Sequence, residues 1–260
     1  MHFIGIDLAW SLNHTQKPET GAIVLDEAGH VLASANLGTD ETIVQFTLNH
    51  RDADGGIVGI DAPLVVPNAT GRRVCEAALQ AVGIPSYPAN RTLFVKSFGG
   101  VRGEQLVARL AAHGFPLVAD IKAGEALQAC VEVYPRAVIR RMWGAITPYK
   151  APGKAKRDMV RQGLQELQTL LTQRLDPPII WPELTPSLDL EHATPGELKR
   201  HADLLDAALS GYICMLAWQR GPSHVETLGT IADGFIMLPR VRNVEQTEVE
   251  PNALSTVAGS

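Results

Sequence analysis

The stretch Phe3-Ile4-Gly5-Ile6-Asp7-Leu8-Ala9-Trp10 and its echo Ile57-Val58-Gly59-Ile60-Asp61-Ala62-Pro63-Leu64 decide the fold that the chain is expected to adopt. Each is a short apolar run with the length and composition of a buried strand, and each carries one aspartate at or near its end. A carboxylate buried beside apolar side chains is costly unless a cation or a hydrogen-bond donor offsets the loss of water. Asp7 and Asp61 therefore either face a shared cation or each cap the turn that follows their own strand.

The segments around these two stretches predict an α/β domain with a five-stranded mixed sheet. Strands are expected at residues 3–7, 21–26, 30–37, 57–62 and 130–135. Short turns join the first three strands, which therefore form an antiparallel meander. A helix that opens at Thr39 separates the third strand from the fourth, and such a crossover makes the fourth strand parallel to one already in the sheet.

Helices and loops are expected to fill the rest of the chain. Residues 63–129 predict a helical and loop insertion, because prolines interrupt the chain after the fourth strand. A late helix begins after Thr194, where Pro195 and Glu197 complete a capping box, and ends near Gly221. We expect one domain over residues 1–244, followed by a polar, flexible tail over 245–260.

Composition and charge restrict the class of protein. The 260 residues are 45% hydrophobic and 20% charged, which is typical of a globular domain, and the net charge of −5 argues against a globally basic nucleic-acid binder. Three widely spaced cysteines, Cys75, Cys130 and Cys214, have no metal-ligand spacing and are expected to be reduced core thiols. No apolar run has the length of a membrane span, and the expected location is the cytoplasm.

Further carboxylates are expected near the two strand aspartates. Glu132 lies inside the fifth strand, and Asp203 and Asp206 stand three residues apart on one face of the late helix. If the parallel strands end at one sheet edge, Asp7, Asp61 and Glu132 converge there, and the helix adds Asp206 or Asp203. Such carboxylates suit Mg²⁺ or Mn²⁺, and two such metals about 4 Å apart support phosphodiester hydrolysis.

Basic residues are candidates for binding a substrate phosphate. The segment from Arg136 to Arg161 carries a strong excess of positive charge, which is either a phosphate-binding surface or a solvated face. A second group follows the Asp61 strand, where a phosphate-binding role and an ordinary surface role are equally open. The predicted substrate-binding residues from both groups are Arg72, Arg73, Arg91, Lys96, Lys150 and Lys154.

Several motifs, spread from one end of the chain to the other, resemble a known family, the DUF429 proteins. The motifs are Gly5-Ile6-Asp7-Leu8-Ala9-Trp10, Gly59-Ile60-Asp61-Ala62-Pro63-Leu64, Arg72 with Cys75-Glu76, Glu132-Val133-Tyr134-Pro135, Asp203-Leu204-Leu205-Asp206-Ala207-Ala208 and Gly234-Phe235-Ile236-Met237-Leu238-Pro239. The resemblance implies a ribonuclease H-like fold with Asp7 as the central metal ligand. It also implies a nuclease that acts on DNA or RNA, by analogy of fold.

Two other functions remain open. Actin-like kinases and ATPases share this fold and carry an aspartate on the first strand, but a Gly/Ser/Thr-rich turn follows theirs. Here Leu8-Ala9-Trp10 takes that place, and bulky side chains keep a backbone away from phosphate. The other alternative is a nucleic-acid or protein-binding member of the fold without turnover. The mild acidity of the chain favours this alternative, whereas the intact carboxylate positions favour the metal-dependent nuclease.

Overall fold

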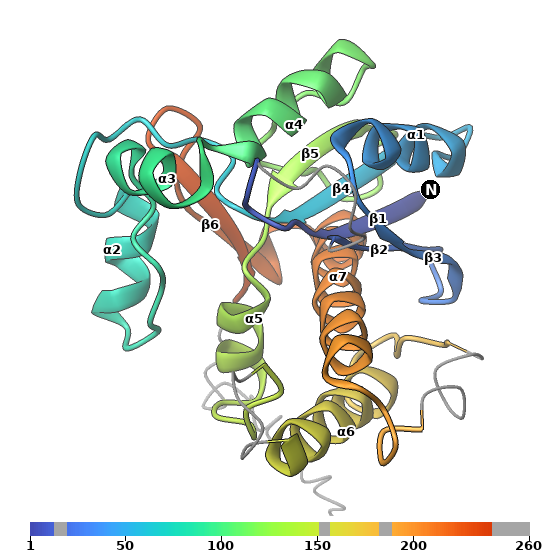
Figure 1. The fold of residues 1–260 in the computed structure, drawn as a ribbon. Coiled ribbons are helices and arrows are strands. Elements are labelled where there is room, and N and C mark those ends of the chain that lie inside the picture. The colour runs from blue at the N-terminus through green and yellow to red at the C-terminus, as the bar shows by residue number, and fades with distance from the viewer. Residues whose placement is uncertain (13–19, 151–156, 182–188, 241–260) are drawn as a thin grey trace, which may run out of the picture.

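A mixed five-stranded sheet forms the centre of the molecule (Figure 1). The computed structural model describes residues 1–12, 20–150, 157–181 and 189–240, so the tail predicted for 245–260 lies outside the described residues. The strands are β1 (His2–Asp7), β2 (Thr20–Leu25), β3 (Val31–Leu37), β4 (Gly56–Asp61) and β5 (Gln128–Glu132). Their order is β3-β2-β1-β4-β5, with β1, β4 and β5 parallel and β2 antiparallel to both its neighbours.

This sheet confirms the predicted meander followed by two parallel strands. The topology is consistent with the ribonuclease H-like fold that the family resemblance implies. Because β1 and β4 pair in parallel with Gly5 opposite Gly59, Asp7 comes to lie directly beside Asp61. Both aspartates therefore reach the same edge of the sheet.

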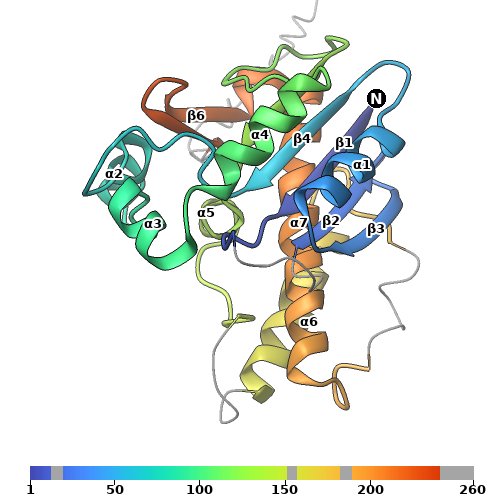
Figure 2. The ribbon, with the colours of Figure 1, turned by 45° about the horizontal axis from the view of Figure 1, so that its top comes forward.

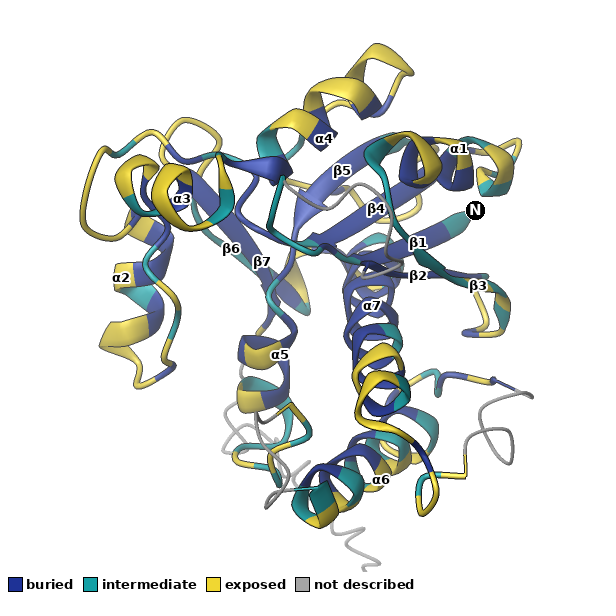
Figure 3. Cartoon of the chain, in the orientation of Figure 1, coloured by how far each residue is buried: buried dark blue, intermediate teal, exposed yellow. Residues whose placement is uncertain are grey.

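Helices cover both faces of the sheet (Figure 2). On one face, α1 (Asp40–His50) and α4 (Arg102–Ala112) pack on the side chains of Ile4, Ile6 and Ile60. On the other face, α7 (Pro195–Arg220) crosses β1, β2 and β4, with Phe3 and Ile57 beneath it. Figure 3 shows that α7 is buried over most of its length, as its buried residues from Leu198 to Ala217 require.

Three glycines allow α7 to lie unusually close to the strands. A Cβ atom at Gly5 would collide with the carbonyl oxygen of Ala207, and one at Gly59 would collide with that of Ser210. A Cβ atom at Gly21 on β2 would meet the backbone of Asp203. Since alternate residues of a strand share a face, Gly5 and Asp7 both face this helix. The glycines thus fix where the acidic turn of α7 meets the sheet edge.

Between β4 and β5 the chain forms the predicted insertion of helices and loops. It contains α2 (Val74–Ala81), α3 (Arg91–Phe98) and α4. Its attachment is ionic as well as apolar, because Arg102 is buried and its guanidinium binds the Asp40 carboxylate at 2.7 Å and the carbonyl oxygens of Ala9 and Gly38. The segment after β1 is thereby held between α1 and α4.

Some elements were not expected from the sequence. The structure adds α5 (Pro135–Met142) directly after β5. It is followed by α6 (Arg157–Gln173), which buries Leu164, Leu167 and Leu171 at helical spacing. After α7, a short 3₁₀ turn at Gly221–Ser223 leads into an antiparallel hairpin of β6 (Val225–Thr230) and β7 (Gly234–Pro239). No helix in the described residues is both long and apolar enough to cross a membrane.

Candidate metal centre

Three aspartates from three elements meet at the edge of the sheet. Asp7 ends β1, Asp61 ends β4, and Asp206 comes from the part of α7 that the glycine contacts bring against the strands. One carboxylate oxygen from each lies within 4.8 Å of the other two, a spacing that could hold a metal ion. Asp203, one turn earlier on α7, is also buried beside this group. The structure thus brings together four of the five predicted catalytic carboxylates.

A lysine ammonium group lies among these carboxylates. The Nζ atom of Lys150 is 2.6 Å from both the Asp7 and Asp206 carboxylates and 3.2 Å from that of Asp203. Lys199 also binds Asp203, at 2.7 Å. Asp61 receives no ion pair or hydrogen bond from any residue within the described part of the chain. Two ammonium groups therefore neutralise only part of the negative charge of the four carboxylates.

The incomplete neutralisation changes the pKa of the strand aspartates. Burial raises the pKa of Asp7 to about 7, and repulsion by Asp206 and Asp203 adds to the effect while Lys150 opposes it. Burial, followed by repulsion from Asp7, raises the pKa of Asp61 well above its ordinary range. Burial alone would lower the pKa of Lys150, but the attraction of the surrounding carboxylates raises it well above its usual value. The group has room for more positive charge than Lys150 supplies.

The arrangement fits a hard divalent cation. Such ions prefer carboxylate oxygens, and an additional positive charge would relieve the repulsion that raises the pKa of Asp61. Lys150 occupies the position facing Asp7 and Asp206, yet its side chain is 39% exposed, so it can swing out towards solvent. Asp7, Asp61 and Asp206 are the residues that would hold the ion.

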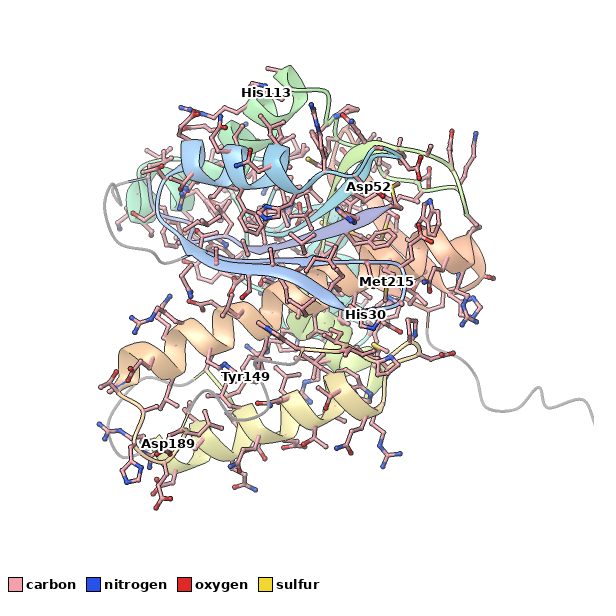
Figure 4. All side chains as sticks on the ribbon, turned by 90° about the vertical axis from the view of Figure 1, so that its right-hand side faces the viewer. His30, Asp52, His113, Tyr149, Asp189 and Met215 are labelled. Atoms are coloured by element: carbon pink, nitrogen blue, oxygen red, sulfur yellow. The ribbon has the colours of Figure 1, made fainter. Side chains whose placement is uncertain are left out.

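Tyr149 completes one side of the group. Its hydroxyl donates a hydrogen bond of 2.7 Å to the Asp206 carboxylate, whose other oxygen faces Lys150. Burial, with repulsion by Asp206, raises the pKa of Tyr149 well above its ordinary value, so the hydroxyl stays a donor. Figure 4 shows Tyr149 between α6 and α7 in that view. In the sequence, only its position next to Lys150 pointed to this tyrosine.

A cavity with basic walls opens beside the aspartates. Its volume is about 340 Å³, and both Asp61 and Asp206 line it. The lining also includes Arg136 and Arg140, which lie four residues apart on α5 and therefore share one face of that helix. An anionic group in this cavity would lie close to positively charged arginines as well as to the two aspartates.

A smaller, more aromatic hollow adjoins Asp61 on the other side. It holds about 70 Å³ and is lined by Trp10, Tyr87 and Tyr134, among others. The Trp10 ring packs on Phe94 and Phe98 with centroid separations of 5.3 and 5.5 Å. Trp10 therefore forms a wall of the site, anchored in the cluster of α3.

Glu132, the fifth predicted carboxylate, points to the opposite face of the sheet. In the register of β4 and β5, Glu132 lies beside Ile60, the residue before Asp61. Its side chain therefore points to the face of the sheet opposite that of Asp61. Its two oxygens accept hydrogen bonds of 2.7 and 2.8 Å from Arg73, and one also accepts from the Leu64 backbone at 2.8 Å. Arg73 also binds Glu76 at 2.9 Å. Glu132 is thus a member of a buried ion network and does not join the three aspartates.

The predicted basic residues separate into different roles. Among those in the described part of the chain, only Lys150 lies at the cluster of aspartates. Arg73 is buried in its pairs with Glu76 and Glu132, which removes it from the surface. The exposed residues are elsewhere: Arg72 donates to the Ser86 carbonyl, Arg91 pairs with Glu104, and Lys96 is on α3. Lys154 lies outside the described residues.

Fold and site together define an α/β protein with a mixed five-stranded sheet, consistent with a ribonuclease H-like fold, and a carboxylate cluster at the ends of its parallel strands. The sequence matches the family described as "Protein of unknown function (DUF429)" over residues 5–226. The chain belongs to this family, as its motifs indicated. No curated protein and no solved structure gives a significant match.

Proposed function

We propose that the protein is a divalent-metal-dependent nuclease that hydrolyses phosphodiester bonds in DNA or RNA. The observation that carries the proposal is the meeting of Asp7, Asp61 and Asp206 within 4.8 Å, beside a cavity that Arg136 and Arg140 also line. The cation would be Mg²⁺ or Mn²⁺, and a pair of such ions would activate a water and stabilise the leaving oxygen. Three unpaired cysteines support a cytoplasmic location.

The residues around the site have separate tasks in this reaction. Asp7, Asp61 and Asp206 hold the cation, which when bound lowers the pKa of a water and stabilises developing charge. Arg136 and Arg140 bind the non-bridging oxygens of the phosphate and fix its orientation in the cavity. Asp203 stays paired with Lys199, and it keeps the acidic turn of α7 in place.

Lys150 serves as an internal counter-ion to the aspartates. Its ammonium contacts Asp7 and Asp206, and because its side chain is partly exposed it would be free to turn towards the substrate phosphate if a cation took its place. Tyr149 keeps its hydrogen bond to Asp206 through this exchange and so preserves the position of that carboxylate. Metal and phosphate binding are therefore expected to support each other.

The first test measures the metal directly. In a thermal-shift titration with Mg²⁺ and Mn²⁺, a ligand of the folded state raises the unfolding midpoint with concentration. We expect a rise for the wild type and for Asp54→Asn, an exposed control, and none for Asp7→Asn. Labelled single-stranded and duplex DNA and RNA, incubated with Mn²⁺, then show whether the wild type cleaves and Asp7→Asn does not.

A second candidate function is binding of nucleic acid or protein without turnover. The observation that favours it is Lys150, because an ammonium group in contact with Asp7 and Asp206 can serve as a permanent counter-ion. In that case Mg²⁺ and Mn²⁺ do not raise the unfolding midpoint of the wild type, and none of the labelled DNA and RNA substrates is cleaved. A metal-dependent rise in the unfolding midpoint that Asp7→Asn abolishes, together with cleavage, would support the nuclease.

A further inference from the structure

A second basic cavity lies at the far end of α7. Its volume is about 340 Å³, and it is enclosed by the ends of α5, α6, α7 and β7. The cationic residues that line it are Arg141, Arg174, Arg220 and Arg240. Arg220 stands 14 residues after Asp206 on the same helix, which at the rise of an α-helix is roughly 20 Å away.

This cavity is separate from the one at the aspartates, although α5 contributes to both. Arg140 lines the cavity beside Asp61 and Asp206, whereas Arg141 lines the second one. Consecutive residues of a helix point about 100° apart, so one short helix can present a guanidinium to each side. Neither Asp61 nor Asp206 lines the second cavity.

The charges of the second cavity do not balance. Arg141 and Arg240 pair with Glu226, and Arg220 pairs with Asp176 at 3.1 Å. Two carboxylates thus face four guanidinium groups. Arg174 makes no ion pair or side-chain hydrogen bond within the described residues. On an acidic protein, this local excess of positive charge needs a counter-ion.

The buried arginine gives an independent sign of a ligand-binding site. The side chain of Arg141 is only 7% exposed, and its terminal nitrogen binds Glu226 and the Pro239 carbonyl. Its Nε–H is buried and has no acceptor among the described residues. A buried donor without a partner is costly, and an oxyanion in the cavity would satisfy it.

We propose that this cavity binds the phosphate group of a ligand, at a site distinct from the carboxylate cluster. Guanidinium groups suit phosphate because their planar donors match its oxygens. Arg174 supplies the unpaired charge and Arg141 the buried donor, while Trp143 and Leu216 give the ligand's remaining part an apolar contact. The phosphate belongs either to a nucleic-acid strand that extends beyond the carboxylates or to a small phosphorylated molecule.

The test uses the full chain in EDTA, so that no metal contributes. Inorganic pyrophosphate is titrated at constant ionic strength while the unfolding midpoint is followed, and a labelled single-stranded oligonucleotide is followed by fluorescence anisotropy. Arg174→Glu reverses an exposed, unpaired charge and is expected to leave folding unchanged. Arg140→Glu makes the same change at the other cavity, and Arg200→Glu makes it on an exposed site outside both.

We expect Arg174→Glu to weaken binding of at least one probe about tenfold or more, the size of a lost charged hydrogen bond. Loss of pyrophosphate binding identifies a small phosphorylated ligand, and loss of oligonucleotide binding identifies a nucleic-acid backbone. The proposal is overturned if neither probe binds, or if Arg174→Glu matches Arg200→Glu with both probes. Binding that only Arg140→Glu reduces also overturns it, since the phosphate then lies beside the aspartates.

Discussion

The chain buries two groups of carboxylates near the same edge of its sheet and treats their charge in opposite ways. In one, Arg73 lies between Glu76 and Glu132, and backbone N–H groups complete the shells of both carboxylates. In the other, Asp61 has no partner in the described residues, and a half-exposed lysine serves the remaining aspartates. Satisfied charges tie the insertion to the sheet, whereas unsatisfied charges leave a place for a ligand.

The difference between the two groups appears in the pKa values of Glu132 and Asp61. Burial raises the pKa of Glu132, but Arg73 opposes the shift through its charge and its hydrogen bonds. No arginine pairs with Asp61 within the described residues. Repulsion by Asp7 and Asp206 instead adds to the effect of burial and raises the pKa of Asp61 further. A strand that ends in a carboxylate is therefore not enough to define a metal ligand. The partners that the tertiary structure supplies decide between a structural tie and a site.

Removal of Arg73 should have the largest effect. Arg73→Ala leaves Glu76 and Glu132 buried without their cation, and this should lower the free energy of unfolding by about 3–5 kcal/mol. The measurement is urea denaturation at pH 7. Arg72→Ala, at the exposed neighbouring position, should change it by less than about 0.5 kcal/mol. Equal losses in the two variants would contradict the structural role of the network.

A methyl group at Gly5 should disturb the packing of α7 on β1, which brings Asp206 beside Asp7. Gly5→Ala forces α7 away from β1, with an expected loss of about 3 kcal/mol in unfolding free energy. It should also abolish the Mg²⁺-dependent thermal shift, because Asp206 moves away from Asp7. The matched control is Gly56→Ala, where a Cβ atom would find only ordinary contacts beyond 3.5 Å. A stable Gly5→Ala protein with an intact metal response would contradict the close packing.

Neutralising Asp61 should stabilise the protein. Its pKa is raised on folding, so the folded state binds more protons than the unfolded state above about pH 4, and stability falls as the pH rises. Asp61→Asn should therefore increase the free energy of unfolding by about 1–2 kcal/mol at pH 8 in EDTA and leave it unchanged near pH 3. Denaturation at several pH values tests this, with Asp54→Asn as the control. A variant less stable than the wild type at pH 8 speaks against an unpaired Asp61.

The smallest effect is expected at Lys150. Lys150→Met removes the ammonium that competes with a metal, so Mg²⁺ should bind roughly three- to tenfold more tightly. Isothermal titration calorimetry measures the affinity directly. Lys96→Met, on the exposed surface of α3, should leave it unchanged. Unchanged affinity in Lys150→Met would mean that the ammonium and the cation occupy separate positions.

Much of the fold could be predicted because the decisive signals are local. The Gly-Ile-Asp runs, the short turns of the meander and the capping box at Thr194 each depend on neighbouring residues. The hairpin of β6 and β7 was missed although Asp233-Gly234 marks its turn. Helix α5 was missed because Pro135 suggested only the end of a strand, whereas it occupies the first turn of a helix.

The sequence by itself determined the two strands that present Asp7 and Asp61, since a period of two residues fixes which side chains share a face. It also placed Asp203 and Asp206 on one turn of the late helix. Only the tertiary structure decided that Glu132 turns to Arg73 and that Lys150 enters the carboxylates. Strand register and contacts between distant residues set these pairings, and no local pattern encodes them.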